Sequence, residues 1–125
     1  MTCKKETKQS IAFKGAQSAK SSVENTITAT AGGVQATALL LDATKSVHNI
    51  TTVATAADAV RLPLAVGSGV QHLVNNSGAA SMKVYGSGTD TIDAVATATG
   101  VSIGAGKARL LVDIAAGKWI SLLGA

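Results

Sequence analysis

The chain has 125 residues, enough for one domain with a single hydrophobic core but too few for two. Hydrophobic residues make up 46% of it and aromatic residues only 2%, so the core must consist mainly of Ala, Val, Leu and Ile. The formal net charge of +4 lies in residues 1–20, where five lysines face one glutamate, because acidic and basic groups are equal in number in the remainder.

Residues 1–24 are predicted to form an extended basic N-terminal arm. This segment is rich in Lys, Ser and Gln, and two apolar side chains, Ile11 and Phe13, stand two positions apart within it. Such a segment is either a solvated tail or an arm that orders on an acidic partner surface. The candidate partner-binding residues are Lys4, Lys5, Lys8, Ile11, Phe13 and Lys14. Nucleic acid is a weaker candidate partner, because the arm has no arginine and only one aromatic ring for stacking.

Residues 25–125 are predicted to form one β-domain. Strand patterns cover residues 26–30, 46–53 and 70–74, while residues 35–41 fit either a short helix or a strand. Residues 60–66 alternate between apolar and other side chains, but Pro63 cannot donate to a strand ladder and therefore marks an edge or a break.

The second half has shorter strands separated by glycine turns. Strands are expected at residues 82–85, 101–103, 107–114 and 118–123, and residues 91–96 fit a short strand or a turn of helix. The glycine turns at 104–106 and 115–117 are interpreted as hairpin turns. Regular short strands with turns at this spacing indicate an all-β fold, namely a single β-sandwich or jelly-roll-like domain.

Several strands near the C-terminal end are apolar on both faces. The runs are Leu110-Leu111-Val112, Trp119-Ile120 and Leu122-Leu123. One face must meet the domain core, and the other needs a cover, for which a neighbouring subunit is the obvious candidate. A homo-oligomer is therefore expected.

No segment matches a catalytic or cofactor motif. Residues 104–107 (Gly-Ala-Gly-Lys) lack the first glycine of a phosphate loop, and Ala108 stands where that loop needs Ser or Thr to bind magnesium. Asp90 and Asp93 would permit a calcium site or a carboxylate pair, but a turn in which Asp90 bonds its own backbone is the preferred interpretation. Cys3 excludes an intrachain disulfide and has no nearby histidine, so a nucleophile is not expected.

The two histidines and the tryptophan are interpreted as structural. His48 and His72 have no partner cysteines and no local pair at ligand spacing, so we expect no metal site and place each as an exposed or interface strand residue. Trp119 is expected to be a core residue near a strand start rather than a ligand platform. The sequence therefore predicts no enzymatic activity, no cofactor and, because no apolar run reaches about 18 residues, no membrane segment.

From residue 49 onward the chain resembles small structural proteins of tailed bacteriophages. The segments that carry the resemblance are residues 50–63 (ITTVATAADAVRLP), 74–80 (VNNSGAA), 84–86 (VYG), 92–93 (ID), 105–107 (AGK) and 116–119 (AGKW). A similar sequence pattern occurs in capsid cement (decoration) proteins and in tail-fibre or spike modules. The basic arm and residues 35–41 fall outside the resemblance.

This resemblance implies a virion protein assembled in the host cytoplasm and placed on the capsid surface. A cement protein of this type would be a trimer that binds the major capsid protein at junctions between capsid subunits, without direct contact to nucleic acid. The alternatives are a tail fibre, spike or baseplate module and, from another class, a carbohydrate-binding β-sandwich.

Overall fold

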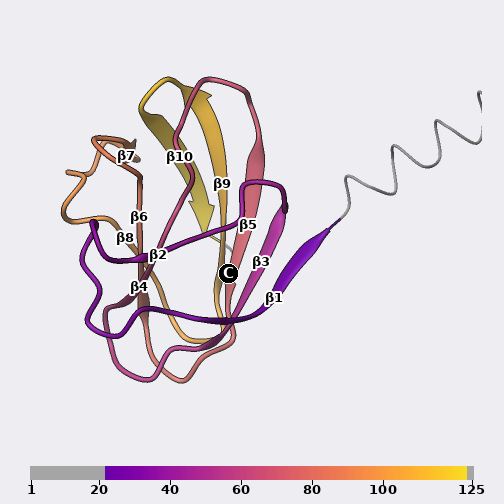
Figure 1. The fold of residues 1–125 in the computed structure, drawn as a ribbon, viewed down its shortest axis with the longest axis vertical. Helices are drawn as coiled ribbons and strands as arrows, with labels where there is room; N and C mark the ends of the chain where they lie inside the picture. The colour runs from indigo at the N-terminus through magenta and orange to yellow at the C-terminus, as the bar shows by residue number, and fades with distance from the viewer. Residues whose placement is uncertain (1–21, 124–125) are drawn as a thin grey trace, which may run out of the picture.

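The computed structural model describes residues 22–123, and this part of the chain consists of strands joined by turns and loops (Figure 1). The strands form two sheets. The large sheet has six strands in the order β1-β3-β5-β9-β10-β7, and the small sheet has four in the order β2-β4-β6-β8. The all-β prediction is confirmed for the described residues.

The strand bounds agree closely with the sequence pattern in the second half of the chain. In the large sheet they are β1 (Val23–Thr28), β3 (Val47–Thr52), β5 (Gln71–Asn76), β9 (Ala108–Ala115), β10 (Lys118–Leu123) and β7 (Thr91–Ile92). In the small sheet they are β2 (Leu39–Leu40), β4 (Asp58–Arg61), β6 (Met82–Tyr85) and β8 (Val101–Ile103). Strand β1 thus begins two residues inside the predicted arm.

The chain visits the two sheets alternately from β1 to β9. As a result, β1, β3 and β5 are parallel neighbours in the large sheet, and β2, β4 and β6 are parallel neighbours in the small sheet. Val23 pairs with Val47 and Asp58 with Met82, 24 residues apart, whereas Val47 pairs with Leu73 and Leu39 with Val60, so a full turn of the chain spans 21 to 26 residues. Successive turns therefore stack on one another in a solenoid-like way, and the antiparallel strands β8, β9 and β10 follow (Figure 1).

The path of the chain corrects one of the two predicted hairpin turns and agrees with the other. The glycine turn at residues 104–106 is not a hairpin turn, because it leads from β8 in the small sheet to β9 in the large one. The turn at residues 115–117 does join a hairpin, since β9 and β10 are antiparallel neighbours. Strand β4 ends at Arg61, two residues before Pro63, which agrees with the predicted break.

One hydrophobic core lies between the sheets. The large sheet contributes Ile50, Leu111 and Trp119, and the small sheet contributes Val60 and Ile103, all of them buried in the same cluster. The side chains are small or medium in size, apart from Trp119, which is 1% exposed. The prediction that Trp119 is buried is confirmed.

Buried carboxylates tie the loops to this core. Asp58 accepts hydrogen bonds from the main-chain N–H groups of Gly32 and Ala54, at 3.1 Å each. Asp113 accepts one from the main-chain N–H of Gly67 at 2.7 Å. A buried loop N–H without a partner would cost about 1–3 kcal/mol, so these aspartates allow irregular backbone to lie against an apolar core.

Candidate interaction surface

A row of apolar side chains crosses the outer face of the large sheet. Side chains alternate along a strand, and because His48 and Ile50 point into the core, Val47 points outward. The strand register then continues the outward row across five strands through Val23, Val47, Leu73, Leu110 and Leu122. Leu122 is 70% exposed and Val23 is 53% exposed.

A second, shorter apolar row runs beside the first. Val112 on β9 pairs with Ile120 on β10, and Ile114 follows on the same face of β9. Ile114 is 50% exposed and Ile120 is 45% exposed. Among the outward positions of β9 and β10, Lys118 is the one charged residue. A sheet face that meets water is normally polar, so this face has the composition of a contact surface.

Asparagines flank the apolar row on the parallel strands. The side-chain amide of Asn49 donates to Asn25 Oδ1 at 3.0 Å, and that of Asn75 donates to Asn49 Oδ1 at 2.9 Å. Ser77 Oγ also donates to Asn49 Oδ1 at 2.9 Å. These polar groups are satisfied by one another, which lowers the cost of covering them with a second surface.

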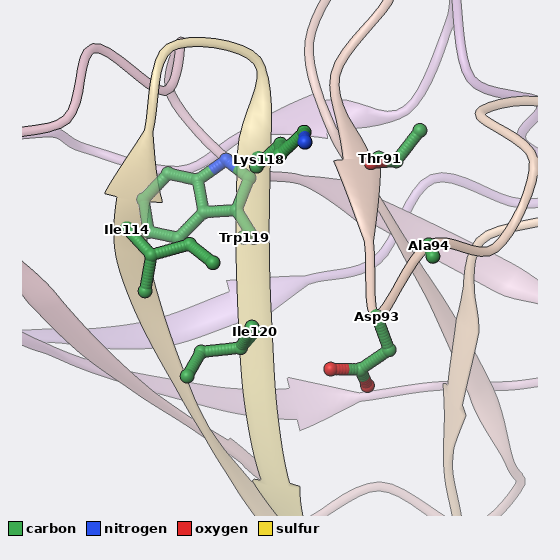
Figure 2. A pocket seen from close by; sticks show the side chains of 7 residues that line it. All are labelled: Thr91, Asp93, Ala94, Ile114, Lys118, Trp119 and Ile120. Carbon is green, nitrogen blue, oxygen red and sulfur yellow. The ribbon is translucent and has the colours of Figure 1, made fainter.

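A shallow groove of about 230 Å³ lies at the β10–β7 end of the same face. It is lined by Thr91, Asp93, Ala94, Ile114, Lys118, Trp119 and Ile120 (Figure 2). The isoleucines lie on the β9–β10 hairpin, and Asp93 and Ala94 face them from the segment after β7. A groove of this size is below the 300–1,000 Å³ typical of small-molecule sites, and it is mostly apolar.

The carboxylates near the groove are engaged within the chain. Asp93 accepts a hydrogen bond from the main-chain N–H of Ser121 at 2.7 Å and another from the Ser121 hydroxyl, and Arg109 lies 3.6 Å from it. Asp90 is 3% exposed and accepts from the main-chain N–H of Ala65 at 2.7 Å. The expectation that Asp90 bonds its own turn is therefore wrong. Asp93 binds Ser121 on β10 and Asp90 binds the loop at Ala65, so the two carboxylates do not form a pair.

The placement of the two histidines corrects the sequence prediction. His48 and His72 are 0% and 1% exposed, whereas exposed or interface positions were expected. His48 Nε2 lies 2.8 Å from His72 Nδ1, and His48 Nδ1 lies 2.8 Å from Glu24 Oε1. The reason is the parallel stacking of β1, β3 and β5, which brings one inward side chain from each strand into contact with the next. The ring of Trp119 lies 5.8 Å from that of His72.

This histidine pair is buried between the sheets. Burial lowers the pKa of His72, the neighbouring His48 lowers it further, and the main-chain group of Lys45 and the carboxylate of Asp113 act in the opposite direction. Within residues 22–123, no three His, Cys, Asp or Glu side chains are grouped so that they could bind a metal ion.

The acidic and basic side chains of the described residues differ in the partners that they have within the chain. All six carboxylates between residues 22 and 123 accept hydrogen bonds from the chain itself. Of the six Lys and Arg residues in that range, Arg109 alone forms an ion pair. Lys107 and Lys118 are exposed. The described residues nevertheless hold equal numbers of acidic and basic groups, and Asp93 is exposed, so the net positive charge of the sequence lies in residues 1–20.

The predicted site residues of the arm cannot be compared with this surface. Lys4, Lys5, Lys8, Ile11, Phe13 and Lys14 all lie outside the described residues. The sequence pattern did identify the doubly apolar strands β9 and β10. It missed Val23, Val47 and Leu73, although the 24-residue spacing of the two valines was a signal that could have revealed them.

Comparison with models of known protein families, with curated proteins and with solved structures finds no match to this chain. In the part of the chain that is described, no helix could span a membrane.

Proposed function

We propose that this chain is a non-enzymatic structural protein of a tailed-bacteriophage virion, most specifically a capsid cement protein that binds at junctions between major capsid subunits. The observation that carries the proposal is the apolar outer face of the large sheet, which remains for a protein neighbour. The net charge of +4 lies in the basic arm, which remains for an acidic lattice. The resemblance of residues 49–125 to phage structural proteins supports the same conclusion.

The mechanism would be stabilisation by mass action. A protein that binds the assembled lattice, but not the separated capsid subunits, lowers the free energy of the assembled form by RT ln(1 + [L]/Kd). No chemical step is involved. The protein would act as a homo-oligomer, with a trimer favoured, on the capsid surface after assembly in the host cytoplasm, and would contact neither nucleic acid nor membrane.

The fold suits this role if the two sheets behave as the layers of a β-sandwich. Both sheets contribute to one core, and buried aspartates tie the connecting loops to it. The parallel stacking of β1, β3 and β5 differs from the antiparallel order of a jelly roll, so we propose the sandwich form of the two predicted variants.

Two alternatives remain open to test. A tail fibre, spike or baseplate module would use the same apolar face and the same arm. A carbohydrate-binding domain would need exposed aromatic platforms, and Trp119 and Tyr85 are 1% and 6% exposed. Within residues 22–123 these are the aromatic residues other than histidine, so that alternative lacks its recognition surface.

Electron microscopy of intact phage particles, labelled with an antibody against this chain, tests the proposal. Labelling spread over the head is the expected result, and labelling confined to the tail would favour the fibre or baseplate alternative. Particles without label would overturn both structural roles. A glycan array probed with the full chain would then decide on the carbohydrate alternative.

A further inference from the structure

We propose that the outer face of the large sheet is the surface through which one copy of this chain binds another. The inference rests on the homo-oligomer of the proposed function and assigns the residues that form a contact; because both copies use the same face, this contact is two-fold and forms a dimer, not the trimer favoured there. The centre of the contact is the row Val23, Val47, Leu73, Leu110 and Leu122, flanked by Val112, Ile114 and Ile120.

The geometry of the face is that of a sheet prepared for a second layer. The row crosses five neighbouring strands without a polar interruption, because the strand register aligns one apolar outward residue from each strand. Strand β10 alone presents Ile120 and Leu122 at 45% and 70% exposure. In a two-layer β-structure such outward rows normally meet another apolar row about 10 Å away.

The size of the face fits a contact between copies. Five strands spaced by about 4.8 Å give a width of about 24 Å, and six residues at about 3.3 Å give a length of about 20 Å. Two such faces in contact cover roughly 1,000 Å², the level that a specific protein interface must reach. One such face, of about 480 Å², lies within the range of about 300–600 Å² of the largest apolar patches on monomers, which are often functional.

The charge of the face favours a second copy over the other candidates. Each copy carries a net charge of +4, so two copies can meet only through a surface where like charges are not brought together. Lys118 is the one charged outward residue of β9 and β10, and it lies at the start of β10, away from Leu122. A surface for an acidic partner would instead present the lysines.

The arm is a weaker candidate for covering this face. It offers two large apolar side chains, Ile11 and Phe13, among five lysines, whereas the row alone contains five large apolar residues. Lysines laid across an apolar face would lose hydration without gaining an acidic partner, because the face has no free carboxylate. A second copy of the face covers the row with matching side chains.

Sedimentation velocity of the full chain at micromolar concentration tests the proposal. We expect the natural sequence to sediment as an oligomer and Leu122→Lys to sediment as a monomer, with self-association weakened by about 100-fold. The matched control is Leu40→Lys on β2 of the small sheet, which is 51% exposed in an equally apolar strand. This control should keep the oligomer.

A second variant guards against a folding artefact. Ile120→Lys changes another exposed position of the same face and should also give a monomer, and circular dichroism should show native β-structure in both variants. A natural sequence that sediments as a monomer, or face variants that associate as well as Leu40→Lys does, would overturn the proposal. Because these measurements use free protein, their result is separate from whether the chain decorates phage heads.

Discussion

His48 Nε2 lies 2.8 Å from His72 Nδ1, although the two residues are 24 positions apart in the sequence. Glu24 Oε1 lies 2.8 Å from His48 Nδ1, and because a carboxylate oxygen accepts, His48 Nδ1–H donates to it. One proton lies between the two facing ring nitrogens of His48 and His72, so the three side chains form one hydrogen-bonded row across β1, β3 and β5. If both rings were doubly protonated, two N–H groups would face each other and the His48–His72 bond would be lost.

Protein stability should consequently fall as the pH is lowered. The pKa of His72 in the folded protein lies below its ordinary value of 6.5, chiefly because the ring is buried. The unfolded chain therefore binds the proton first, so the contribution of this ring is fully present above about pH 6.5 and is lost as the pH falls toward the folded-state pKa. Melting temperatures measured at pH 8, 7, 6 and 5 at constant ionic strength should decrease in this order.

His72→Gln provides the control for that titration. The variant should be less stable at pH 8, but its melting temperature should change less between pH 8 and 5, because the titrating ring is gone. Asp42 and Asp58 do not interfere, since hydrogen bonds lower each pKa from 3.8, and neither does Asp113, where burial raises the pKa but hydrogen bonds outweigh it; the stabilising effect of all three is lost only in stronger acid. An unchanged pH profile in His72→Gln would show that another group titrates.

Trp119 should contribute more to stability through its apolar ring than through its ring N–H. The side chain is 1% exposed and packs near His72, yet its Nε1 atom is buried without a hydrogen-bond partner within the described residues. Trp119→Ala should destabilise the fold by about 3–5 kcal/mol, because it leaves a cavity in the core. Urea unfolding followed by circular dichroism would measure this loss.

Trp119→Phe separates the two contributions of that side chain. Phenylalanine retains much of the apolar area and removes the unpaired N–H, so the loss should stay below about 2 kcal/mol. A loss as large as that of Trp119→Ala would mean that the N–H group is paired in solution. Full stability of Trp119→Ala, by contrast, would mean that the ring is not part of the core.

Local patterns predicted most of the strands, because each of these strands is a short apolar run between turn residues. Residues 82–85, 101–103 and 118–123 were predicted with the bounds that the structure has. The pairing of the strands could not be derived in the same way. The glycine turns at 104–106 and 115–117 look alike, yet the first joins the two sheets and the second joins a hairpin. Long-range packing decides between these outcomes.

The histidine pair and the apolar row escaped the sequence analysis for a related reason. The stacking is not visible as a repeated motif, because the turns differ in length and many residues that stack differ in type, as Glu24, His48 and His72 do. Only the stacking of turns makes such residues neighbours. Asn25 and Asn49 do recur after one turn, as Val23 and Val47 also do, and a hydrogen bond joins the two asparagines.

Two glycines with nearly the same backbone angle should respond differently to substitution. Gly88 has φ +59° and open space where a Cβ would lie, whereas at Gly100, with φ +62°, a Cβ would lie 2.5 Å from the carbonyl oxygen of Val84 and 2.8 Å from the Tyr85 ring. Gly88→Ala should cost only the left-handed strain of about 1–2 kcal/mol. Gly100→Ala adds the steric overlap and should cost about 2–5 kcal/mol.

Thermal unfolding of both glycine variants in one buffer tests this difference. The pair is informative because the backbone strain is shared and cancels in the comparison. Equal melting temperatures would mean that the segment at Gly100 moves away from β6 at little cost, so that its close packing against Val84 and Tyr85 is not required for the fold.

The basic arm should control both the rate and the lifetime of binding to the particle. Replacing its lysines with Gln should slow association and reduce its salt dependence, because the positive charges no longer attract an acidic surface. Phe13→Ala should chiefly raise the dissociation rate, since the ring provides apolar contact area.

Deletion of the arm should stop at residue 21, because the carbonyl of Ser22 accepts hydrogen bonds from the main-chain N–H groups of Ser46 and Val47. This shortened chain should fold and should bind particles much more weakly than the full chain. Association and dissociation rates measured at several salt concentrations, with Lys83→Gln as the control outside the arm, would test these predictions. Equal decoration by the full and the shortened chain would mean that the arm is a solvated tail.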